Sequence, residues 1–407
     1  MTIRRRVKGG EPRSRILFVD DEPRVLDALR RTLRPMHDRW DMRFATGGPE
    51  ALELAGEKPF HVVVSDLRMP GMDGARLLRE VRQRWPGTVR FILSGHADKD
   101  MILDTVGPTH RFFTKPCDPD ILVQAISRAL ATLSALHKTE IGPLVSGTIT
   151  LPTLPELYSQ LKDLLSHPET TIEQTASVVS QDVAMSARIL HVANSSFFGP
   201  RREVTNIAEA LKCLGRETAK SIVLTAGVFD QLPENLMSQF NVREIETHSM
   251  RVGSLAGQIL WTITPGERTI VDDAVTAGLL HDVGKLVLIG SLQAEYGEIW
   301  TEASEGETDL ISLEEERLRT NHAEVGGYLA DLWDLPMQIV DAISCHHEPG
   351  KSLNDSFSAL TAVHIANVLV HETSDSMTAP PAPPLDRPYV AGLLAMDRLD
   401  EWRGLAM

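Results

Sequence analysis

Short apolar runs alternate with amphipathic stretches over residues 16–114. Each run is four or five residues long, and the stretches between them place apolar residues three or four positions apart, as at Leu26, Leu29 and Leu33. This alternation predicts a parallel sheet with helices on both faces. The predicted strands are Ile16–Val19, Met42–Ala45, Phe60–Val64, Val89–Leu93 and Arg111–Thr114.

A longer helix is predicted after this sheet. Asp118 can cap its first turn, and Pro119 suits its first position. Its apolar residues follow a heptad spacing. The helix either packs only on its own sheet, or it also couples to a neighbouring domain or a second protomer. The heptad residues are Leu122, Ile126, Ala129, Leu133 and Leu136, and Ile141-Gly-Pro143 is expected to end the segment.

Residues 144–371 have a helical pattern almost throughout. Three segments begin with a capping-box pattern, in which a Thr or Asn is followed three positions later by Gln or Glu and then by an apolar-periodic run. No alternating strand pattern of useful length interrupts them. The boxes are Thr171/Gln174, Asn206/Glu209 and Asn321/Glu324; a Pro-rich linker, 378–384, and one closing helix, 389–402, follow.

Charge is distributed unevenly along the 407 residues. Residues 1–143 carry 24 Lys and Arg against 19 Asp and Glu, a net charge of +5, whereas residues 144–407 carry 17 against 37, a net charge of −20. Because such a segment repels a phosphate backbone, direct nucleic-acid binding is not expected. No run approaches the roughly 18–20 apolar residues of a membrane span, and the basic N-terminus lacks a signal peptide's apolar region. Three separated cysteines suit a reducing cytoplasm.

Polar residues follow four of the five predicted strands. Ligands of a parallel sheet bind at the carboxyl ends of its strands, so these side chains should converge. Converging carboxylates repel one another unless a hard cation joins them, and Mg²⁺ takes carboxylates together with water and phosphate oxygens. A hydroxyl and an ammonium nearby could hold the phosphoryl oxygens. The residues are Asp20, Asp21, Asp66, Ser94 and Lys115.

Histidines are concentrated in the helical region. Six of the 14 lie between 248 and 364, and they include the pairs His281-Asp282 and His346-His347 at predicted helix ends. Imidazoles and carboxylates from several helices can converge on a metal in a bundle core. Such ligands suit Fe, Mn, Zn or Ni rather than Ca. A single buried histidine is more often a hydrogen-bonded core residue, which is the alternative for His191 and His364.

The first region resembles the two-component receiver family. The matching stretches are Val19-Asp-Asp-Glu-Pro23, Ser65-Asp-Leu-Arg-Met-Pro-Gly-Met-Asp-Gly74, Leu93-Ser-Gly95 and Thr114-Lys-Pro116. The resemblance implies that Asp66 is phosphorylated by a cognate sensor histidine kinase. It also implies a Mg²⁺ ion held by Asp20, Asp21, Asp66 and the backbone carbonyl of Arg68, phosphoryl contacts from Ser94 and Lys115, and a switch role for Phe112.

The second region resembles the HDOD domain, the HD-related output domain of bacterial signalling proteins. The matching stretches are Leu151-Pro-Thr-Leu-Pro155, Ser180–Leu190, Val192–Gly199, Ala277-Gly-Leu-Leu-His-Asp-Val-Gly-Lys285, His322-Ala-Glu-Val-Gly326 and Trp333-Asp-Leu-Pro336. HDOD domains resemble the metal-dependent HD phosphohydrolases, including the HD-GYP enzymes that cleave cyclic di-GMP. By that resemblance Lys285 would contact substrate phosphate, and the metal ligands would be Glu244, His248, His281, Asp282, His322, His346 and His347.

Two departures from the HD pattern bear on activity. Asn367 stands where HD enzymes have their last metal-binding Asp, which weakens metal binding. The Gly-Tyr-Pro loop is missing after His346-His347, so a substrate-recognition element is lacking and cleavage of cyclic di-GMP is not expected.

The sequence therefore predicts an α/β domain, a flavodoxin-like doubly wound sheet of five parallel strands, followed by an all-α HD-like domain. The expected boundaries are a disordered lead-in at 1–14, the receiver at 15–117, its last helix and connecting helix at 118–143, the HDOD domain at 144–371, and the linker and final helix at 372–407. The chain is expected to be a cytoplasmic response regulator that relays phosphorylation to a downstream signalling protein. A homodimer is compatible with the pattern, and no direct contact with nucleic acid or a membrane is expected. The alternative is a phosphorylation-controlled, metal-dependent phosphodiesterase.

Overall fold

The computed structural model describes most of the chain, in two compact units, Met1–Ser134 and Ala135–Met407. The described residues are 13–95, 109–136, 151–153, 155–167, 169–194, 203–215, 218–219, 229–231, 234–306, 308–352, 354, 356–373, 380, 384–393 and 396–406. The predicted lead-in before residue 13, the helix end at 141–143 and most of the Pro-rich linker therefore lie outside the described residues.

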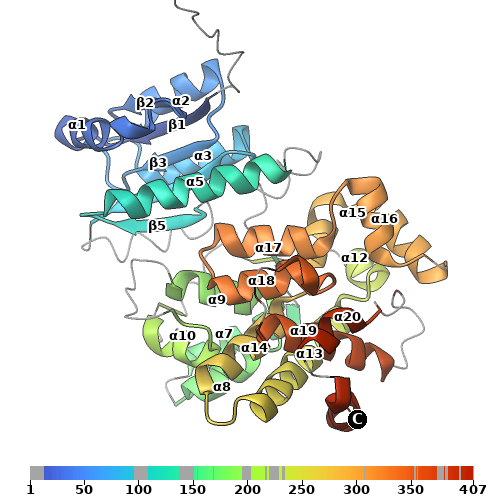
Figure 1. The fold of residues 1–407 in the computed structure, drawn as a ribbon. Coiled ribbons are helices and arrows are strands. Elements are labelled where there is room, and N and C mark those ends of the chain that lie inside the picture. Colours follow the sequence, from blue (N-terminus) through green and yellow to red (C-terminus); the bar gives the residue numbers. More distant parts are fainter. Residues whose placement is uncertain are drawn as a thin grey trace, which may run out of the picture. The chain divides into compact units, whose positions relative to one another are not determined.

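The N-terminal unit is a five-stranded sheet flanked by helices (Figure 1). The strand order is β2-β1-β3-β4-β5, and every pair is parallel. This is the doubly wound, flavodoxin-like order, so the predicted fold is confirmed. The strands are β1 (Ser14–Val19), β2 (Trp40–Ala45), β3 (Val62–Ser65), β4 (Val89–Ser94) and β5 (Arg111–Thr114), and the helices are α1 (Pro23–Thr32), η1 (Arg34–Met36), α2 (Gly48–Glu57), α3 (Gly74–Arg84) and α5 (Pro119–Leu136).

Helix α5 begins where the sequence predicts. The Asp118 carboxylate accepts a hydrogen bond from the backbone N–H of Asp120 at 2.9 Å, which caps the first turn. The heptad side chains of Leu122, Ile126, Ala129 and Leu133 are all buried, and Ile121 beside them is 52% exposed. The side chain of Leu136 lies outside the described residues. Whether the helix also couples to a partner stays a prediction.

The C-terminal unit is helical, as predicted, apart from a short sheet of two parallel strands. Those strands are β6 (Leu151–Thr153) and β7 (Phe229–Gln231). They are too short to show an alternating pattern in the sequence. The helices are α7 (Pro155–Ser166), α8 (Ile172–Val179), α9 (Val183–Asn194), α10 (Ile207–Leu214), α12 (Glu234–Gln239), α13 (Val242–Ile263), α14 (Arg268–Leu280), α15 (Val283–Glu305), α16 (Leu310–Leu318), α17 (His322–Leu332), α18 (Met337–Cys345), η4 (Pro349–Lys351), α19 (Ala359–Glu372), α20 (Arg387–Gly392), η5 (Met396–Arg398) and α21 (Leu399–Ala406).

The three predicted caps form in different ways. Thr171 and Gln174 make the full reciprocal capping box. Asn206 accepts hydrogen bonds from the backbone N–H groups of the first turn of α10. Asn321 accepts from the backbone of Glu324, but the Glu324 carboxylate accepts from the Thr320 hydroxyl instead of closing the box. The helix starts were thus predictable, and the reciprocal bond was not.

Helix α13 packs along α14 and α19 in the middle of this unit. Glycines allow the closest approach: a Cβ on Gly253 would lie 2.7 Å from the Val275 carbonyl oxygen, and one on Gly278 would lie 2.7 Å from the Cα of Gly253. Helices α14 and α15 form one stretch, Arg268–Glu305, that is long and apolar enough to cross a membrane by composition alone. Its apolar window is 72% buried inside the structure, as in the core helix of a globular domain.

The last described part of the chain forms three short helical elements instead of one helix. The sequence predicts one helix over 389–402, but α20 ends at Gly392, and η5 and α21 follow. Glycine is a poor helix former, which accounts for the break. Trp402 on α21 is fully buried, and its indole N–H donates to the Thr262 hydroxyl at 3.1 Å. The end of the chain is thereby attached to α13.

Candidate functional sites

The carboxyl edge of the N-terminal sheet brings two carboxylates and one ammonium into contact. Asp20 follows β1, Asp66 follows β3 and Lys115 follows β5. The Lys115 ammonium donates to Asp20 Oδ2 at 2.6 Å and also to Asp66 Oδ1. Asp20 and Asp66 are 3% and 8% exposed, so both carboxylates are largely withdrawn from water. A single lysine thus bridges two buried acids.

The backbone around Asp66 is held on several sides. Its N–H donates to the Val19 carbonyl at 2.7 Å, and its Oδ2 accepts from the Arg68 N–H at 2.7 Å. Gly74 begins α3 directly against this segment, and a Cβ there would overlap the Asp66 carbonyl oxygen. A glycine is therefore required where the start of α3 packs against the backbone of Asp66.

Burial and charge act against each other at this site. Burial raises the pKa of Asp66, and the Lys115 ammonium offsets part of that rise. Burial would lower the pKa of Lys115, but its hydrogen bonds to Asp20 and Asp66 outweigh this and raise it. The lysine therefore stays charged beside the acids.

The other predicted residues of this site lie around the same edge. Ser94 ends β4, its side chain is buried, and its carbonyl accepts from the Lys115 N–H at 2.7 Å. Asp21 is half-buried. Phe112 lies within β5 and is 3% exposed.

A second constellation forms in the helical unit. It gathers the N-terminus of α15, the N-terminus of α17 and the end of α18, which carry Asp282, His322 and the pair His346-His347 respectively. One ligand atom from each of these four residues lies within 4.8 Å of all the others. His248 and His281 form a similar set around the same Asp282. Asp282 is thus common to both sets.

Glycines place these helix ends together. A Cβ on Gly284 would overlap the His322 carbonyl, so α15 and α17 can meet only with glycine there. A Cβ on Gly327 would lie 2.5 Å from the Ser344 side chain, where α17 meets α18. The glycine after His281-Asp282 is therefore a packing requirement of the site.

Hydrogen bonds fix the orientation of three imidazoles. His281 Nδ1 donates to the Gly278 carbonyl at 2.7 Å, and His346 Nδ1 donates to the Ile343 carbonyl at 2.8 Å. His322 Nδ1 contacts the Glu314 carboxylate at 2.8 Å. Metal-binding histidines commonly use one ring nitrogen in this way and present the other to the metal. In all three residues the Nε2 atom is turned toward Asp282.

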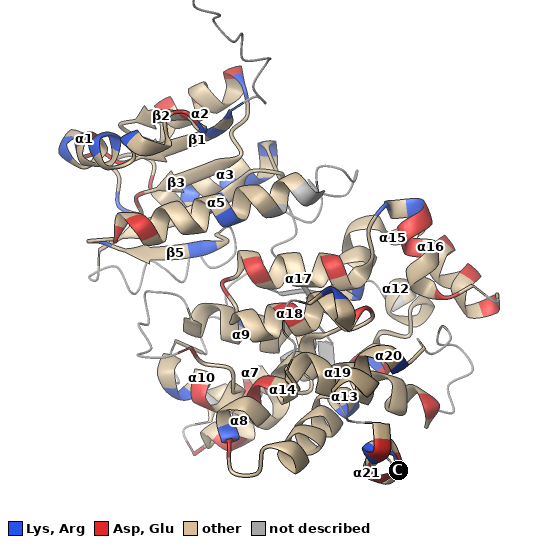
Figure 2. Ribbon diagram, in the orientation of Figure 1, with Lys and Arg blue, Asp and Glu red and all other residues tan. Residues whose placement is uncertain are grey.

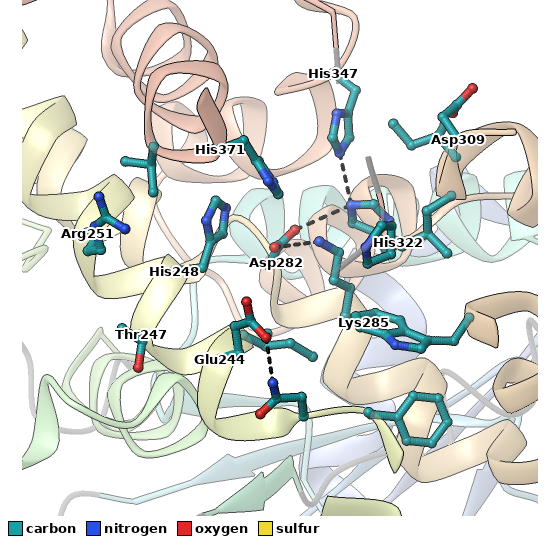
Figure 3. Close-up of a pocket in the computed structure, with 18 residues that line it drawn as sticks. Glu244, Thr247, His248, Arg251, Asp282, Lys285, Asp309, His322, His347 and His371 are labelled. Carbon is teal, nitrogen blue, oxygen red and sulfur yellow. Dashed lines mark hydrogen bonds and ion pairs between the residues drawn. The ribbon is translucent and has the colours of Figure 1, made fainter. Parts of the chain in front are cut away.

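Several buried polar atoms at this point have no hydrogen-bond partner among the described residues: His281 Nε2, His346 Nε2, His347 Nδ1 and Asp282 Oδ1. Such atoms are costly unless something satisfies them. His322 Nε2 and His347 Nε2 lie 2.9 Å apart, a distance at which the two rings share one proton (Figure 3). Imidazole nitrogens and a carboxylate oxygen fit a transition-metal ion, and these atoms are divided between the two ligand sets that share Asp282.

Most of the imidazoles are in the neutral form that binds metal. For His322, burial would lower the pKa, but the Glu314 carboxylate raises it. Burial lowers the pKa of His346 and His347 well below the usual range, and it lowers that of His281 as well. Burial would raise the pKa of Asp282, but the neighbouring His281 and Lys285 lower it far below the usual range. Neutral imidazoles and a charged carboxylate are competent ligands at neutral pH.

A cavity of about 220 Å³ opens beside these residues. His248, Asp282, Lys285, His322, His347 and His371 line it, with Phe240 and Trp300 on its apolar side. Glu244 also lines it, but its carboxylate accepts from the Asn241 side chain and is not part of either ligand set (Figure 3). The structure therefore brings six of the seven predicted ligands together and leaves Glu244 on the cavity lining, outside both ligand sets.

Sequence reasoning missed Glu314 and His371. Glu314 is fully buried and accepts from the Tyr296 hydroxyl at 2.6 Å as well as from both the backbone and the ring of His322. The ring of His371 lies 4.3 Å from that of His248, and burial lowers its pKa to about 4. A buried acid within the polar run Glu314-Glu315-Glu316 has no signature in sequence. His371 is seven residues after His364 on α19, which could have indicated that it shares a helix face.

Sequence profiles of two families match the chain. The response regulator receiver domain matches residues 16–127, and the HDOD domain matches residues 151–349. The chain is a response regulator with a receiver domain and an HDOD domain. The phosphoacceptor candidates belong to the receiver domain, and the histidine cluster belongs to the HDOD domain.

Similar proteins share only parts of this chain. The hydrogenase transcriptional regulatory protein HoxA of Cupriavidus necator is 38% identical over 117 residues, which are 28% of this chain and 24% of HoxA. An uncharacterized protein of Treponema pallidum is 22% identical over 220 residues, which are 54% of this chain and 42% of that protein. The chain thus covers less than half of each of these relatives.

Among solved structures, the MmoQ response regulator of Methylococcus capsulatus is 26% identical. It covers 63% of this chain and 98% of its own, with a TM-score of 0.46. An HDOD domain protein of unknown function from Geobacter sulfurreducens is 22% identical and covers 68% and 97%, with a TM-score of 0.38.

Proposed function

We propose that a cognate sensor histidine kinase phosphorylates Asp66 and that the HDOD domain passes the resulting change to a downstream signalling protein in the cytoplasm. The observation that carries this proposal is the Lys115 bridge between Asp20 and Asp66. A carboxylate held by a lysine at a strand end is placed to accept a phosphoryl group and then to share the lysine with it.

Each residue has a definite part in the proposed transfer. Asp66 Oδ1 attacks the phosphorus, and the donor's leaving group departs on the opposite side. Lys115 then turns from the carboxylate to a phosphoryl oxygen, and the Ser94 hydroxyl donates to another. Asp20, Asp21, Asp66 and the Arg68 carbonyl would hold a Mg²⁺ ion, which neutralises phosphoryl charge when bound. Phe112, buried in β5, is the proposed switch.

The test is labelling by a small donor such as acetyl phosphate in Mg²⁺. The wild-type chain should become phosphorylated, and the Asp66→Asn chain should not. Asp73→Asn is a matched control, because Asp73 lies in the same segment but caps α3 through the Arg76 N–H at 2.7 Å. Equal labelling of the wild type and Asp66→Asn would contradict the assignment.

The relay is proposed to use protein contact rather than nucleic acid. The net charge of −20 over residues 144–407 supports this, and so do the abundant acidic residues on the helices of that unit (Figure 2). Helix α5 is the proposed coupling element, within the chain or in a homodimer. Sedimentation of the wild type and Leu133→Glu, with and without a phosphoryl mimic, tests it. Unchanged mass and shape in all four samples would make α5 a simple tether.

A metal-dependent phosphohydrolase is the second candidate, favoured by the unpartnered nitrogens and the carboxylate around Asp282. A bound transition metal would activate water and polarise a phosphate. A cavity of about 220 Å³ is below the usual size of pockets for larger ligands, which argues against a cyclic dinucleotide. Elemental analysis with a phosphodiesterase assay tests this candidate. If the wild-type chain hydrolyses the phosphodiester robustly and His281→Ala and Asp282→Ala abolish this activity, the phosphohydrolase becomes the better supported of the two functions.

A further inference from the structure

We propose that the HDOD domain holds one metal ion rather than two, because Lys285 and Asn367 occupy the place of the second. The inference rests on the metal site of the second candidate function and concerns how many ions that site accepts. It assigns to Lys285 a role different from substrate contact. The two oxygens of Asp282, which face different partners, carry the argument.

The Oδ1 atom of Asp282 faces the first ligand set. His322 Nε2 lies 3.3 Å from it and His346 Nε2 lies 3.8 Å from it, while Oδ1 itself has no hydrogen-bond partner among the described residues. His347 adjoins His322 on the other side. Three imidazoles and one carboxylate oxygen therefore surround a point, and no Lys or Arg side chain of the described residues contacts Oδ1 there. These four ligands suffice for one tetrahedral ion.

The Oδ2 atom of Asp282 faces an internal cation. The Lys285 ammonium donates to it at 2.6 Å (Figure 3). His281 Nε2 lies 3.4 Å from the same oxygen. The Lys285 side chain is only 12% exposed, and its backbone N–H also donates to the Asp282 carbonyl at 2.9 Å. A second metal ion shared through Oδ2 would meet this fixed positive charge at close range. The lysine already neutralises that side of the carboxylate.

The remaining ligand of the second set is also engaged. His248 Nε2 lies 2.9 Å from Asn367 Oδ1, and because an amide oxygen only accepts, this ring nitrogen carries the proton. Asn367 is 2% exposed and brings no charge with which to attract a cation. In the second ligand set, Asp282 Oδ2 and His248 Nε2 are thus engaged within the protein, and only His281 Nε2 has no partner among the described residues. In the first set, by contrast, Asp282 Oδ1 itself has no such partner.

A single ion has a consequence for the output. It would join the ends of α15, α17 and α18 through four protein ligands, an arrangement typical of a structural site. Two-metal hydrolysis needs both ions to hold the attacking and leaving oxygens. The HDOD domain is thus a metal-stabilised signalling domain in this account.

The experiment counts metal ions in the full-length chain. The wild type, Lys285→Met, Asn367→Asp, the double variant and the control Lys351→Met are loaded with Zn²⁺, freed of excess and analysed for zinc per chain. Lys351 is a matched control because its side chain is 59% exposed and it pairs with Glu348 outside the ligand sets. Zinc titration followed by calorimetry gives the affinities, and thermal melting shows that each variant is folded.

The expected result is one ion in the wild type and in Lys351→Met, and two in the double variant. Lys285→Met alone should bind the second ion about 10- to 1,000-fold more tightly than the wild type does. This is the range by which one neighbouring charge changes the proton affinity of a group. Two ions in the wild type, or one in a folded double variant, would overturn this inference. No ion in the wild type would instead overturn the metal site itself. If the double variant does not fold, the affinity of Lys285→Met decides.

Discussion

The receiver and HDOD domains each place a lysine on a buried aspartate, yet the surroundings differ. In the receiver domain Lys115 bridges two carboxylates, and the nearby groups are oxygens and a hydroxyl. In the HDOD domain Lys285 pairs with Asp282 alone, and the nearby groups are imidazoles. Oxygen ligands favour Mg²⁺ and phosphate, whereas imidazoles favour a transition metal. Under the proposed functions, the same kind of ion pair therefore serves a phosphoacceptor in one domain and a metal site in the other.

The largest expected effect separates the two sites. Asp282→Asn should lose the HDOD metal, because it removes the one carboxylate shared by both ligand sets, and it should still be phosphorylated on Asp66. Asp66→Asn should show the reverse. Elemental analysis and acetyl phosphate labelling of both variants measure this. Loss of phosphorylation in a folded Asp282→Asn chain would show that the comparison is mistaken.

A smaller effect is expected at the residue that orients His322. Glu314→Gln should weaken metal binding about 10- to 100-fold, the usual cost of removing a hydrogen-bond partner of a metal ligand. The control is Glu316→Gln, on the exposed side of α16. Zinc titration measures both, and Tyr296→Phe should give a smaller change in the same direction. Equal affinities for Glu314→Gln and Glu316→Gln would show that Glu314 has no orienting role.

A third prediction concerns Gly74, which packs against the backbone of the proposed phosphoacceptor Asp66. Gly74→Ala should destabilise the receiver domain by about 1–3 kcal/mol, the range for overpacking, and should slow labelling of Asp66. Gly56→Ala is the control, since a Cβ there meets nothing within 4 Å in helix α2 and alanine is the better helix former. Urea unfolding and labelling rates measure both. A Gly74→Ala protein as stable as the wild type would remove the proposed constraint.

The smallest expected effect depends on pH. Burial and the neighbouring Asp182 raise the pKa of Glu246, whose Oε2 accepts from the Val183 N–H at 2.8 Å. The folded chain therefore keeps the proton on Glu246 at a pH where the unfolded chain has already released it. The free energy of unfolding consequently falls as pH rises from the ordinary carboxyl pKa to the raised pKa of the folded state. Glu246→Gln should remove this loss, so its melting temperature should exceed that of the wild type at neutral pH and approach it in acid. A constant difference at all pH values would contradict this.

Much of the fold could be predicted from sequence, because its signals are local. The five strands are short apolar runs, and the caps at Asp118 and Thr171 are chemical signatures of helix starts. The strand pair β6 and β7 is only three residues long on each side, so no periodicity could indicate it. The break after Gly392 was also missed, because the apolar pattern continues across it.

The candidate sites were predictable in their residue types and less so in their contacts. Motif spacing indicated Asp66 and the His281-Asp282 pair. The two carboxylate oxygens of Asp282 have different partners because of the way α15 packs against α17. That packing geometry cannot be predicted from the sequence alone. Glu314 was missed because its role arises from burial against Tyr296 and His322, two contacts between separate helices.

The most direct test of the relay is amide hydrogen exchange of the full-length chain, with and without a phosphoryl mimic such as beryllofluoride in Mg²⁺, with Asp66→Asn as the control. The account predicts changed exchange at the carboxyl edge of the receiver sheet and also in peptides of the HDOD helices, with neither change in Asp66→Asn. Changes confined to residues 13–136 of the wild-type chain would contradict the claim that the HDOD domain receives the signal.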